Sequence, residues 1–170
     1  MAVLVKLQKK WKNKNIGIPT KMRLLKALVW PVVTYGCEAW ILKESEIKKI
    51  NAFEMKCIRK VLGIVYLDRK TNTEVLNKAG TGRDLMAKAK ERKLKYFGHI
   101  ARQDDSLEKS IMMGMVEGKR SRGRPQKTWI KNITEWTGMS IPDMYRATKD
   151  KNQWRKSVHV IAQRQCGGEA

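Results

Sequence analysis

Hydrophobic residues recur along this chain at intervals of three and four, which is the spacing of one face of an α-helix. Alternation with a period of two, the mark of β-strands, is weak throughout. The clearest stripe lies between residues 45 and 62, where Ser45 is a typical N-cap and Gly63 a typical C-terminal stop. Its members are Ile47, Ile50, Phe53, Cys57, Ile58, Val61 and Leu62. The pattern predicts an all-α protein.

Helix start and stop signals divide the rest of the chain into further segments. Pro19 suits the first turn of a helix that runs to about Tyr35, and Pro31 should kink it because proline lacks a backbone donor. From Leu24 to Tyr35 nearly every residue is apolar, so we expect a central helix buried all round. The other predicted helices cover roughly residues 2–14, 71–80 and 84–102, with further ones beginning near Ser106, Pro125, Ser140 and Lys151.

The length of 170 residues, 42% of them hydrophobic, is enough to bury a substantial core. Polar residues and glycines accumulate between residues 103 and 124, and this change in composition predicts a seam. We expect a larger helical body over residues 1–105, a linker with a basic loop over 106–124, and a smaller C-terminal helical unit over 125–170.

The charge is strongly unbalanced, because 37 Lys and Arg face 16 Asp and Glu and give a net charge of +21. Residues 1–37 contain eight basic residues and no acid, and residues 118–134 are also free of acids. Such a chain repels itself unless a polyanion neutralises it. We therefore expect binding to the phosphate backbone of a DNA or RNA duplex, without sequence preference. The alternative is a charge that serves solubility or an acidic protein partner.

A row of cations that is almost single-signed, with only Asp84 and Glu91 nearby, is predicted on the helix over residues 84–102. Its members Lys88, Arg92, Lys95, His99 and Arg102 fall within a sector of about 80° and span roughly 20 Å, and we call this set the basic ridge. Met86, Leu94, Phe97 and Ala101 lie on the opposite side. The ridge is long enough to follow several phosphates of a duplex, although charged helix faces commonly serve solvation alone.

The stretch KRSRGRPQKTW contains five further candidate cations for binding nucleic acid: Lys119, Arg120, Arg122, Arg124 and Lys127. Its R-G-R-P core matches the centre of an AT-hook, in which two arginines enter a narrow minor groove. Ser121 stands where a hook usually has proline, and apolar residues continue from Pro125 with helical spacing. We favour a basic loop that leads into a helix N-terminus near Arg124 and Pro125, and that contacts phosphate.

The cysteines and histidines predict no metal site or cofactor. Cys37, Cys57 and Cys166 form no C-x-x-C pair, and His99 and His159 lie far from them in sequence. Zinc requires clustered ligands, usually four, so we expect reduced thiols instead.

Catalytic motifs are also missing. The adjacent acids Asp104 and Asp105 follow a helix and have no third acid in a supporting place, so we expect a capping or loop role for them and no two-metal chemistry. The sequence contains no P-loop, zinc-protease or nucleophile-elbow motif. We expect the chain not to be an enzyme.

No apolar run approaches the length of a membrane span, and the stretch over residues 27–37 is too short. Residues 1–5 are followed at once by lysines, which is the wrong order for a secretory signal. We expect no membrane contact and an intracellular location.

Five blocks of sequence, in this order, resemble one family: YGCEAW (35–40), FEMKCIRKVLGI (53–64), KLKYFGHIAR (93–102), RSRGRPQKTW (120–129) and QWRKSVH (153–159). The family is the endonuclease-reverse transcriptases of non-LTR retrotransposons. The resemblance covers about residues 5–160 and lies in the region after the polymerase palm. It implies a thumb-like helical bundle followed by a helical tail, and by the same likeness a nuclear location.

The resemblance also implies a mechanism, in which thumb helices grip the primer-template duplex. The family's Y-x-D-D turn, which holds Mg²⁺ in the palm, does not occur here, and Arg102-Gln103-Asp104-Asp105 is not one. We therefore expect a fragment of a reverse transcriptase that neither polymerises nor cuts, such as a truncated or domesticated copy or an inert element remnant. One alternative is a non-catalytic helical interaction module, and another is part of an enzyme that is active when a palm is supplied in trans.

Overall fold

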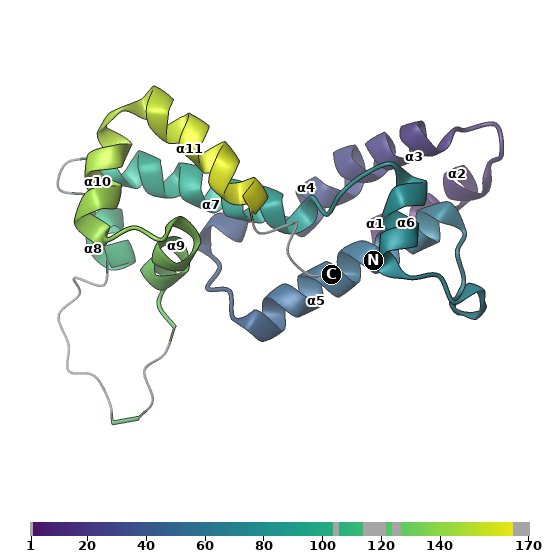
Figure 1. Ribbon diagram of the computed structural model, residues 1–170, viewed down its shortest axis with the longest axis horizontal. Helices are drawn as coiled ribbons and strands as arrows, with labels where there is room; N and C mark the ends of the chain where they lie inside the picture. The colour runs from purple at the N-terminus through teal and green to yellow at the C-terminus, as the bar shows by residue number, and fades with distance from the viewer. Residues whose placement is uncertain (1, 104–105, 114–121, 124–126, 165–170) are drawn as a thin grey trace. The chain divides into compact units, whose positions relative to one another are not determined.

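The structure is a computed structural model that describes residues 2–103, 106–113, 122–123 and 127–164 (Figure 1). Across these ranges the chain forms helices and turns and contains no strand, which confirms the all-α prediction. The helices are α1 (Ala2–Lys6), α2 (Gln8–Lys12), α3 (Ile18–Leu24), α4 (Trp30–Val33), α5 (Glu44–Leu62), α6 (Asn72–Ala79), α7 (Leu85–Ala101), α8 (Leu107–Met113), α9 (Trp129–Thr137), α10 (Ile141–Lys149) and α11 (Lys151–Arg164). A π-helical segment, η1 (Leu25–Val29), and two 3-10 turns, η2 (Cys37–Ala39) and η3 (Tyr66–Asp68), complete them.

The chain divides into two compact units. The first comprises Met1–Tyr35 with Ser45–Met86, and the second comprises Gly36–Glu44 with Ala87–Ala170. The division falls inside the first turn of α7, so most of this helix belongs with the C-terminal helices. The predicted boundaries at residues 105 and 124 partition the chain differently, and they stay a prediction.

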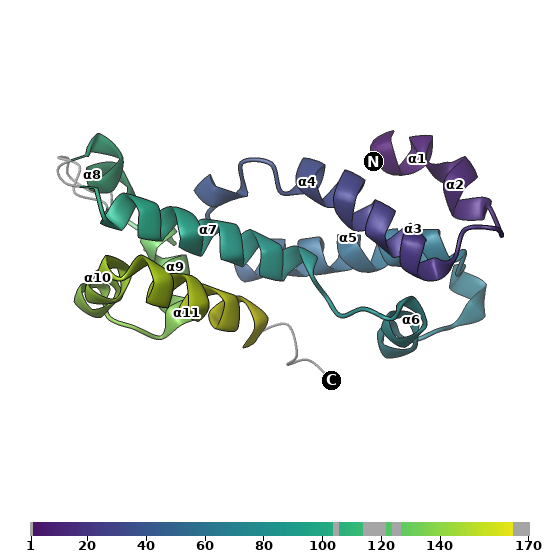
Figure 2. The same cartoon turned by 90° about the horizontal axis from the view of Figure 1, so that it is seen from above.

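One hydrophobic core holds the first unit together, and α5 runs beside the α3–η1–α4 run within it (Figures 1 and 2). The core residues are Leu4, Trp11, Met22, Leu25, Val29, Trp30, Met55, Cys57, Ile58, Val61, Val75, Ala79 and Leu85. The predicted stripe of α5 supplies three of them, Cys57, Ile58 and Val61. The helical periodicity therefore gave the correct buried face.

The predicted helix over residues 19–35 forms without a break, but its middle part is π-helical instead of α-helical. In its π-helical segment the N–H of Trp30 bonds to the carbonyl oxygen of Leu25, five residues back. Pro31 supplies no N–H and crowds the carbonyl four residues before it, and the wider π turn accommodates this. The expectation of burial all round is wrong, because the core lies on one side only and leaves Leu28, Val32 and Tyr35 exposed.

Local capping signals fix several helix ends as predicted. Gly63 adopts φ +69° after α5, and the N–H of Ile64 returns to the carbonyl of Arg59 at 3.0 Å. Thr71 begins α6 with a capping box in which its N–H donates to Glu74 at 2.7 Å, and Gly80 ends that helix with φ +63°. Ser45 lies in the first turn of α5, which begins at Glu44, instead of serving as its N-cap.

Aromatic side chains form the centre of the second unit, where α11 runs along α7 (Figure 2). The ring of Phe97 lies 5.8 Å from that of Trp154, 6.1 Å from that of Tyr145 and 6.4 Å from that of Trp129, measured between centroids. The indole N–H of Trp154 donates to the carbonyl of Leu94 at 3.1 Å. These contacts combine apolar burial with satisfied polar groups, as buried tryptophans require.

The tryptophans therefore serve mainly in packing, as predicted. Trp30, Trp129, Trp136 and Trp154 are buried, whereas Trp40 is half-buried. One predicted helix start is wrong: α9 begins at Trp129, with Thr128 as its N-cap and Lys127 outside the helix. Arg124 and Pro125 themselves lie outside the described residues.

Candidate nucleic-acid interface

The basic ridge lies on a helix whose apolar side faces the core. Met86, Leu94 and Phe97 are buried, whereas Lys95 and His99 are exposed. The remaining ridge cations, Lys88, Arg92 and Arg102, are half-buried. Burial along their aliphatic stems still allows the charged heads to reach solvent.

Lys95 and Arg102 of the ridge bind oxygen atoms of the protein. Lys95 Nζ lies 2.6 Å from the carboxylate of Glu91, one turn earlier on α7. Arg102 follows the last residue of α7, and its guanidinium donates to the carbonyl of Thr148 at 3.0 Å. The Lys95–Glu91 pair is largely exposed, and such pairs contribute little to stability. A phosphate can therefore compete with Glu91 for Lys95.

The other ridge residues have different surroundings. The guanidinium of Arg92 interacts with the thiol of Cys37. Lys88 has no hydrogen bond or ion pair among the described residues, and His99 lies 3.3 Å from the side-chain amide of Gln103. The structure thus places four ridge residues on α7 and Arg102 directly after it, but it ties several of them to protein groups. Contact between the ridge and nucleic acid stays a prediction.

Two lysines of α7 lie in the core, where sequence reasoning did not place them. Lys93 is fully buried, and its ammonium donates to the carbonyl of Trp40 at 2.6 Å and to Asn132 Oδ1 at 3.0 Å. It also lies 5.0 Å and 5.3 Å from the ring centroids of Trp129 and Trp136, within the range of cation–π contact. Burial lowers the pKa of Lys93 to about 7, and the charge of nearby Lys127 acts in the same direction.

Lys90 is also buried, 5.7 Å from the ring centroid of Trp136. A signal for these positions did exist in the sequence, because Met86, Lys90, Lys93 and Phe97 follow one another at helical spacing on the apolar side. The positive charge of these lysines hid that signal, because cations are almost never fully buried.

The predicted basic loop is described in part. Arg122 is exposed, and Lys127 pairs with Glu135 at 2.6 Å. Lys119, Arg120 and Arg124 lie outside the described residues. The structure therefore places Lys127 beside an acid of α9, whereas the choice between an AT-hook and a phosphate-binding loop stays a prediction.

A second group of cations, in the first unit, carried no site residues in the sequence-based prediction. We call it the N-terminal basic segment: Lys6, Lys9, Lys10, Lys12, Lys14, Lys21 and Arg23. None of these side chains makes an ion pair within the described parts of the chain. All but Lys21, which is half-buried, are exposed. The acid-free composition of residues 1–37 was the signal that could have identified them.

The backbone that carries this segment is fixed from within. The indole N–H of Trp11 donates to the carbonyl of Leu4 at 3.1 Å, which ties α2 to α1. Both residues are buried in the core of the first unit. The lysines between and after them are consequently presented outward on an ordered surface.

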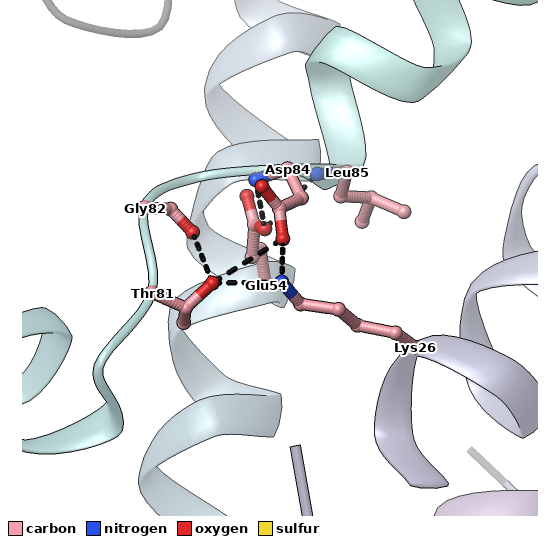
Figure 3. Close-up of polar contacts among 6 residues, drawn as sticks. All are labelled: Lys26, Glu54, Thr81, Gly82, Asp84 and Leu85. Atoms are coloured by element: carbon pink, nitrogen blue, oxygen red, sulfur yellow. Dashed lines mark hydrogen bonds and ion pairs between the residues drawn. The ribbon is translucent and has the colours of Figure 1, made fainter. Parts of the chain in front are cut away.

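The carboxylate of Glu54 has an unusual environment (Figure 3). It is 1% exposed, and its Oε1 accepts the backbone N–H groups of Asp84 at 2.8 Å and Leu85 at 3.0 Å, at the start of α7. Oε2 has no hydrogen-bond partner among the described residues, and burial raises the pKa of Glu54. Its geometry is that of a helix cap supplied by a distant residue.

A cation stands beside this cap. Lys26 pairs with the carboxylate of Asp84 and donates to the hydroxyl of Thr81 at 2.8 Å (Figure 3). Among the eight basic residues of positions 1–37, Lys26 therefore forms an ion pair with a described acid, whereas the seven of the N-terminal basic segment do not. Glu54 and Lys26 together hold the loop that leads into α7.

Within the described residues, no three His, Cys, Asp or Glu side chains gather where they could hold a metal ion. Cys37 and Cys57 are buried free thiols, and burial raises the pKa of Cys57 to about 11. His99 and His159 are exposed. Cys166 and the acid pair Asp104 and Asp105 lie outside the described ranges.

The helices in the described ranges are too short or too polar to cross a membrane. No protein-family model matches the chain, and no solved structure matches it. The chain is similar to an uncharacterised transposon-derived protein of Caenorhabditis elegans, with 27% identity over 145 residues. The match covers 79% of this chain and 52% of that protein, so the chain spans about half the length of the curated relative. The chain is therefore related to a transposon-derived protein.

Proposed function

We propose that this chain is a sequence-nonspecific nucleic-acid-binding part of a retrotransposon reverse transcriptase, without catalysis of its own. It grips the phosphate backbone of a primer-template duplex with thumb-like helices. The observation that carries the proposal is the N-terminal basic segment, whose seven cations have no ion pair with a described residue. The relation to a transposon-derived protein supports the same reading.

The physical basis of the grip is neutralisation of phosphate. Each lysine or arginine that meets a phosphate releases condensed counterions, and this gain does not depend on base sequence. A cation that is already paired with a carboxylate contributes less to the affinity for phosphate, because that ion pair must first be broken. The unpaired N-terminal basic segment should therefore contribute more than Lys95 or Lys127, both of which have acid partners.

A charge-removal series tests this ranking. The variant K9Q/K10Q/K12Q should bind duplexes of scrambled sequence about ten-fold or more weakly at low salt, because three phosphate contacts are lost. The matched variant K9R/K10R/K12R keeps the charge and should bind as the parent does. Equal binding by the glutamine and parent proteins would remove this segment from the interface.

The ridge on α7 is tested separately with K88A/R92A/K95A. We expect evenly weaker binding across sequences and a flatter salt dependence. Unchanged binding at low salt would exclude this face. Primer extension with and without a separately supplied polymerase palm then tests whether the chain takes part in catalysis in trans.

A second candidate function is a helical interaction module. It is favoured by the exposed residues Leu28, Val32 and Tyr35, which lie four and three residues apart along η1, α4 and the turn after α4. Polyglutamate separates the two candidates, because it offers negative charge without bases or a duplex geometry. Binding to polyglutamate as tight as to a duplex of equal charge would favour an acidic protein partner.

A further inference from the structure

The turn between α5 and α6 presents three consecutive apolar side chains to solvent. Val65, Tyr66 and Leu67 are 57%, 96% and 86% exposed, and we call them the apolar tip. Single exposed apolar residues are ordinary on protein surfaces, but contiguous ones mark interaction sites. Neither the core nor the basic segments described above account for them.

The tip is held in shape by its own hydrogen bonds. The N–H of Val65 donates to the carboxylate of Asp68 at 2.8 Å, and the N–H of Arg69 closes the 3-10 turn on the carbonyl of Tyr66 at 3.2 Å. Arg69 has φ +45°, a left-handed conformation that is uncommon for a residue other than glycine. The turn is thus defined although its side chains are not packed.

The far end of the turn is anchored to α5. The guanidinium of Arg59 donates to the carbonyl of Lys70 at 2.8 Å and to Asn72 Oδ1 at 3.0 Å. On the near end, Gly63 and Ile64 close α5 as described above. Both ends are therefore fixed, and Tyr66 projects from a rigid support at low entropic cost on binding.

Three cations without acid partners lie close to the tip in the sequence. Lys56 and Lys60 lie on the last turns of α5, and Arg69 follows the 3-10 turn; none of them makes an ion pair with a described residue. The nearby acid Asp68 is engaged by the N–H of Val65. Lys70 is the cation of this region that does have an acid partner, Glu74 at 3.5 Å. A ligand for this surface should combine a flat apolar face with negative charge.

We propose that Tyr66 stacks on an unpaired base of a bound nucleic acid, with Leu67 beside it and Arg69 and Lys60 neutralising the adjacent phosphates. Base–aromatic stacking needs one ring and tolerates any base. This inference rests on the proposed function, because the bulk of the affinity comes from phosphate contacts elsewhere. It adds a preference for junctions between duplex and single strand.

A lipid surface also combines apolar and anionic character, but the geometry favours a base. Membrane binding grows with the apolar area buried, and here that area ends with the three residues of the tip. The apolar sides of the flanking helices are used in the core, where Val61 and Val75 are buried. One exposed ring on a fixed turn suits a single base better than an acyl layer.

The test compares a blunt duplex with the same duplex carrying a short unpaired overhang that contains 2-aminopurine. Y66A should bind the overhang duplex about 5- to 150-fold more weakly than the parent, the loss that corresponds to one stacked base. Its binding to the blunt duplex should stay within about twofold. Y66F and Y66W should retain the preference and the quenching of 2-aminopurine fluorescence.

The control is L107A, because Leu107 is an apolar side chain that is 75% exposed but lies outside the tip. This control should bind both duplexes as tightly as the parent does and should leave the quenching of 2-aminopurine fluorescence unchanged. All variants should keep the parent's melting temperature. Overhang binding by Y66A as tight as by the parent overturns the inference, and so does an equal loss on both duplexes. Loss of binding to vesicles of phosphatidylcholine and phosphatidylserine, with duplex binding intact, assigns the tip to membranes instead.

The two proposals fail in different ways. A parent protein that binds no blunt duplex at low salt contradicts the proposed function and the stacking site together. A parent that binds the blunt duplex in a salt-dependent manner, with no selective effect of Y66A, contradicts the stacking site alone.

Discussion

Gly98 of α7 lies close against Trp154 of α11, and this contact gives a sharp test of the packing in the second unit. A Cβ at this position would lie 2.3 Å from Nε1 and 2.5 Å from Cδ1 of Trp154, and 3.3 Å from Nη1 of Arg102. Carbon atoms attract one another best at about 3.5–4.0 Å, so these contacts are strongly repulsive. Trp154 is buried and cannot move aside without losing its hydrogen bond to Leu94.

The expected size of the effect for Gly98→Ala follows from three contributions. Replacing glycine by alanine inside a helix stabilises it by about 1 kcal/mol. Forcing extra volume into a packed core costs about 1–3 kcal/mol. Separating the indole N–H of Trp154 from the carbonyl of Leu94 costs about 1–3 kcal/mol more. The free energy of unfolding of the second unit should fall by about 1–5 kcal/mol.

Urea denaturation followed by tryptophan fluorescence and circular dichroism measures this change. Gly82→Ala is the matched control, because a Cβ there meets no atom within 4 Å, and it should change the free energy of unfolding by less than about 0.5 kcal/mol. Trp154→Phe removes the crowded nitrogen. The double variant should therefore lose less free energy of unfolding than the two single variants lose when their losses are added. A Gly98→Ala protein as stable as the parent would refute the packing of α11 on α7.

Two further changes test buried charge. Glu54→Ala leaves the N–H groups of Asp84 and Leu85 without an acceptor and should lower the free energy of unfolding by about 2–4 kcal/mol, whereas Glu54→Gln keeps an acceptor. Because the pKa of Glu54 is raised, the folded state holds its proton longer, so the parent loses stability as pH rises from 4.5 through the folded pKa; Glu54→Gln should remove that loss. The pKa of Lys93 is lowered from 10.5 to about 7, so in that window the unfolded state binds more protons and the stability of the second unit should rise with pH, a trend that Lys93→Met should abolish in urea titrations.

Local signals made much of the fold predictable. The stripe of α5, the capping box at Thr71 and the stops at Gly63 and Gly80 depend on residues a few positions apart, so the sequence displays them directly. The π-helical segment before Pro31 was not predicted, because its register depends on how the surrounding core accepts the proline. The exposed outer face of that helix depends likewise on which side the neighbouring helices cover.

The sequence could predict the candidate site only where the contacts of a residue come from its neighbours in the sequence. The ion pair of Lys95 with Glu91 lies within one turn of helix, but the burial of Lys93 depends on Trp129 and Trp136, which come from α9. The exposure of the apolar tip likewise depends on what the rest of the unit leaves uncovered. The N-terminal basic segment could have been chosen from its lack of acids alone.

The proposed grip is tested most directly by the salt dependence of binding. Filter binding of the whole chain to DNA, RNA and hybrid duplexes of scrambled sequence should give a logarithm of affinity that falls linearly with the logarithm of salt concentration. The slope should become shallower by about 1 for each lysine of the N-terminal basic segment replaced by glutamine. Binding that is absent at low salt, or that keeps the parent's slope when those lysines are removed, would contradict the account.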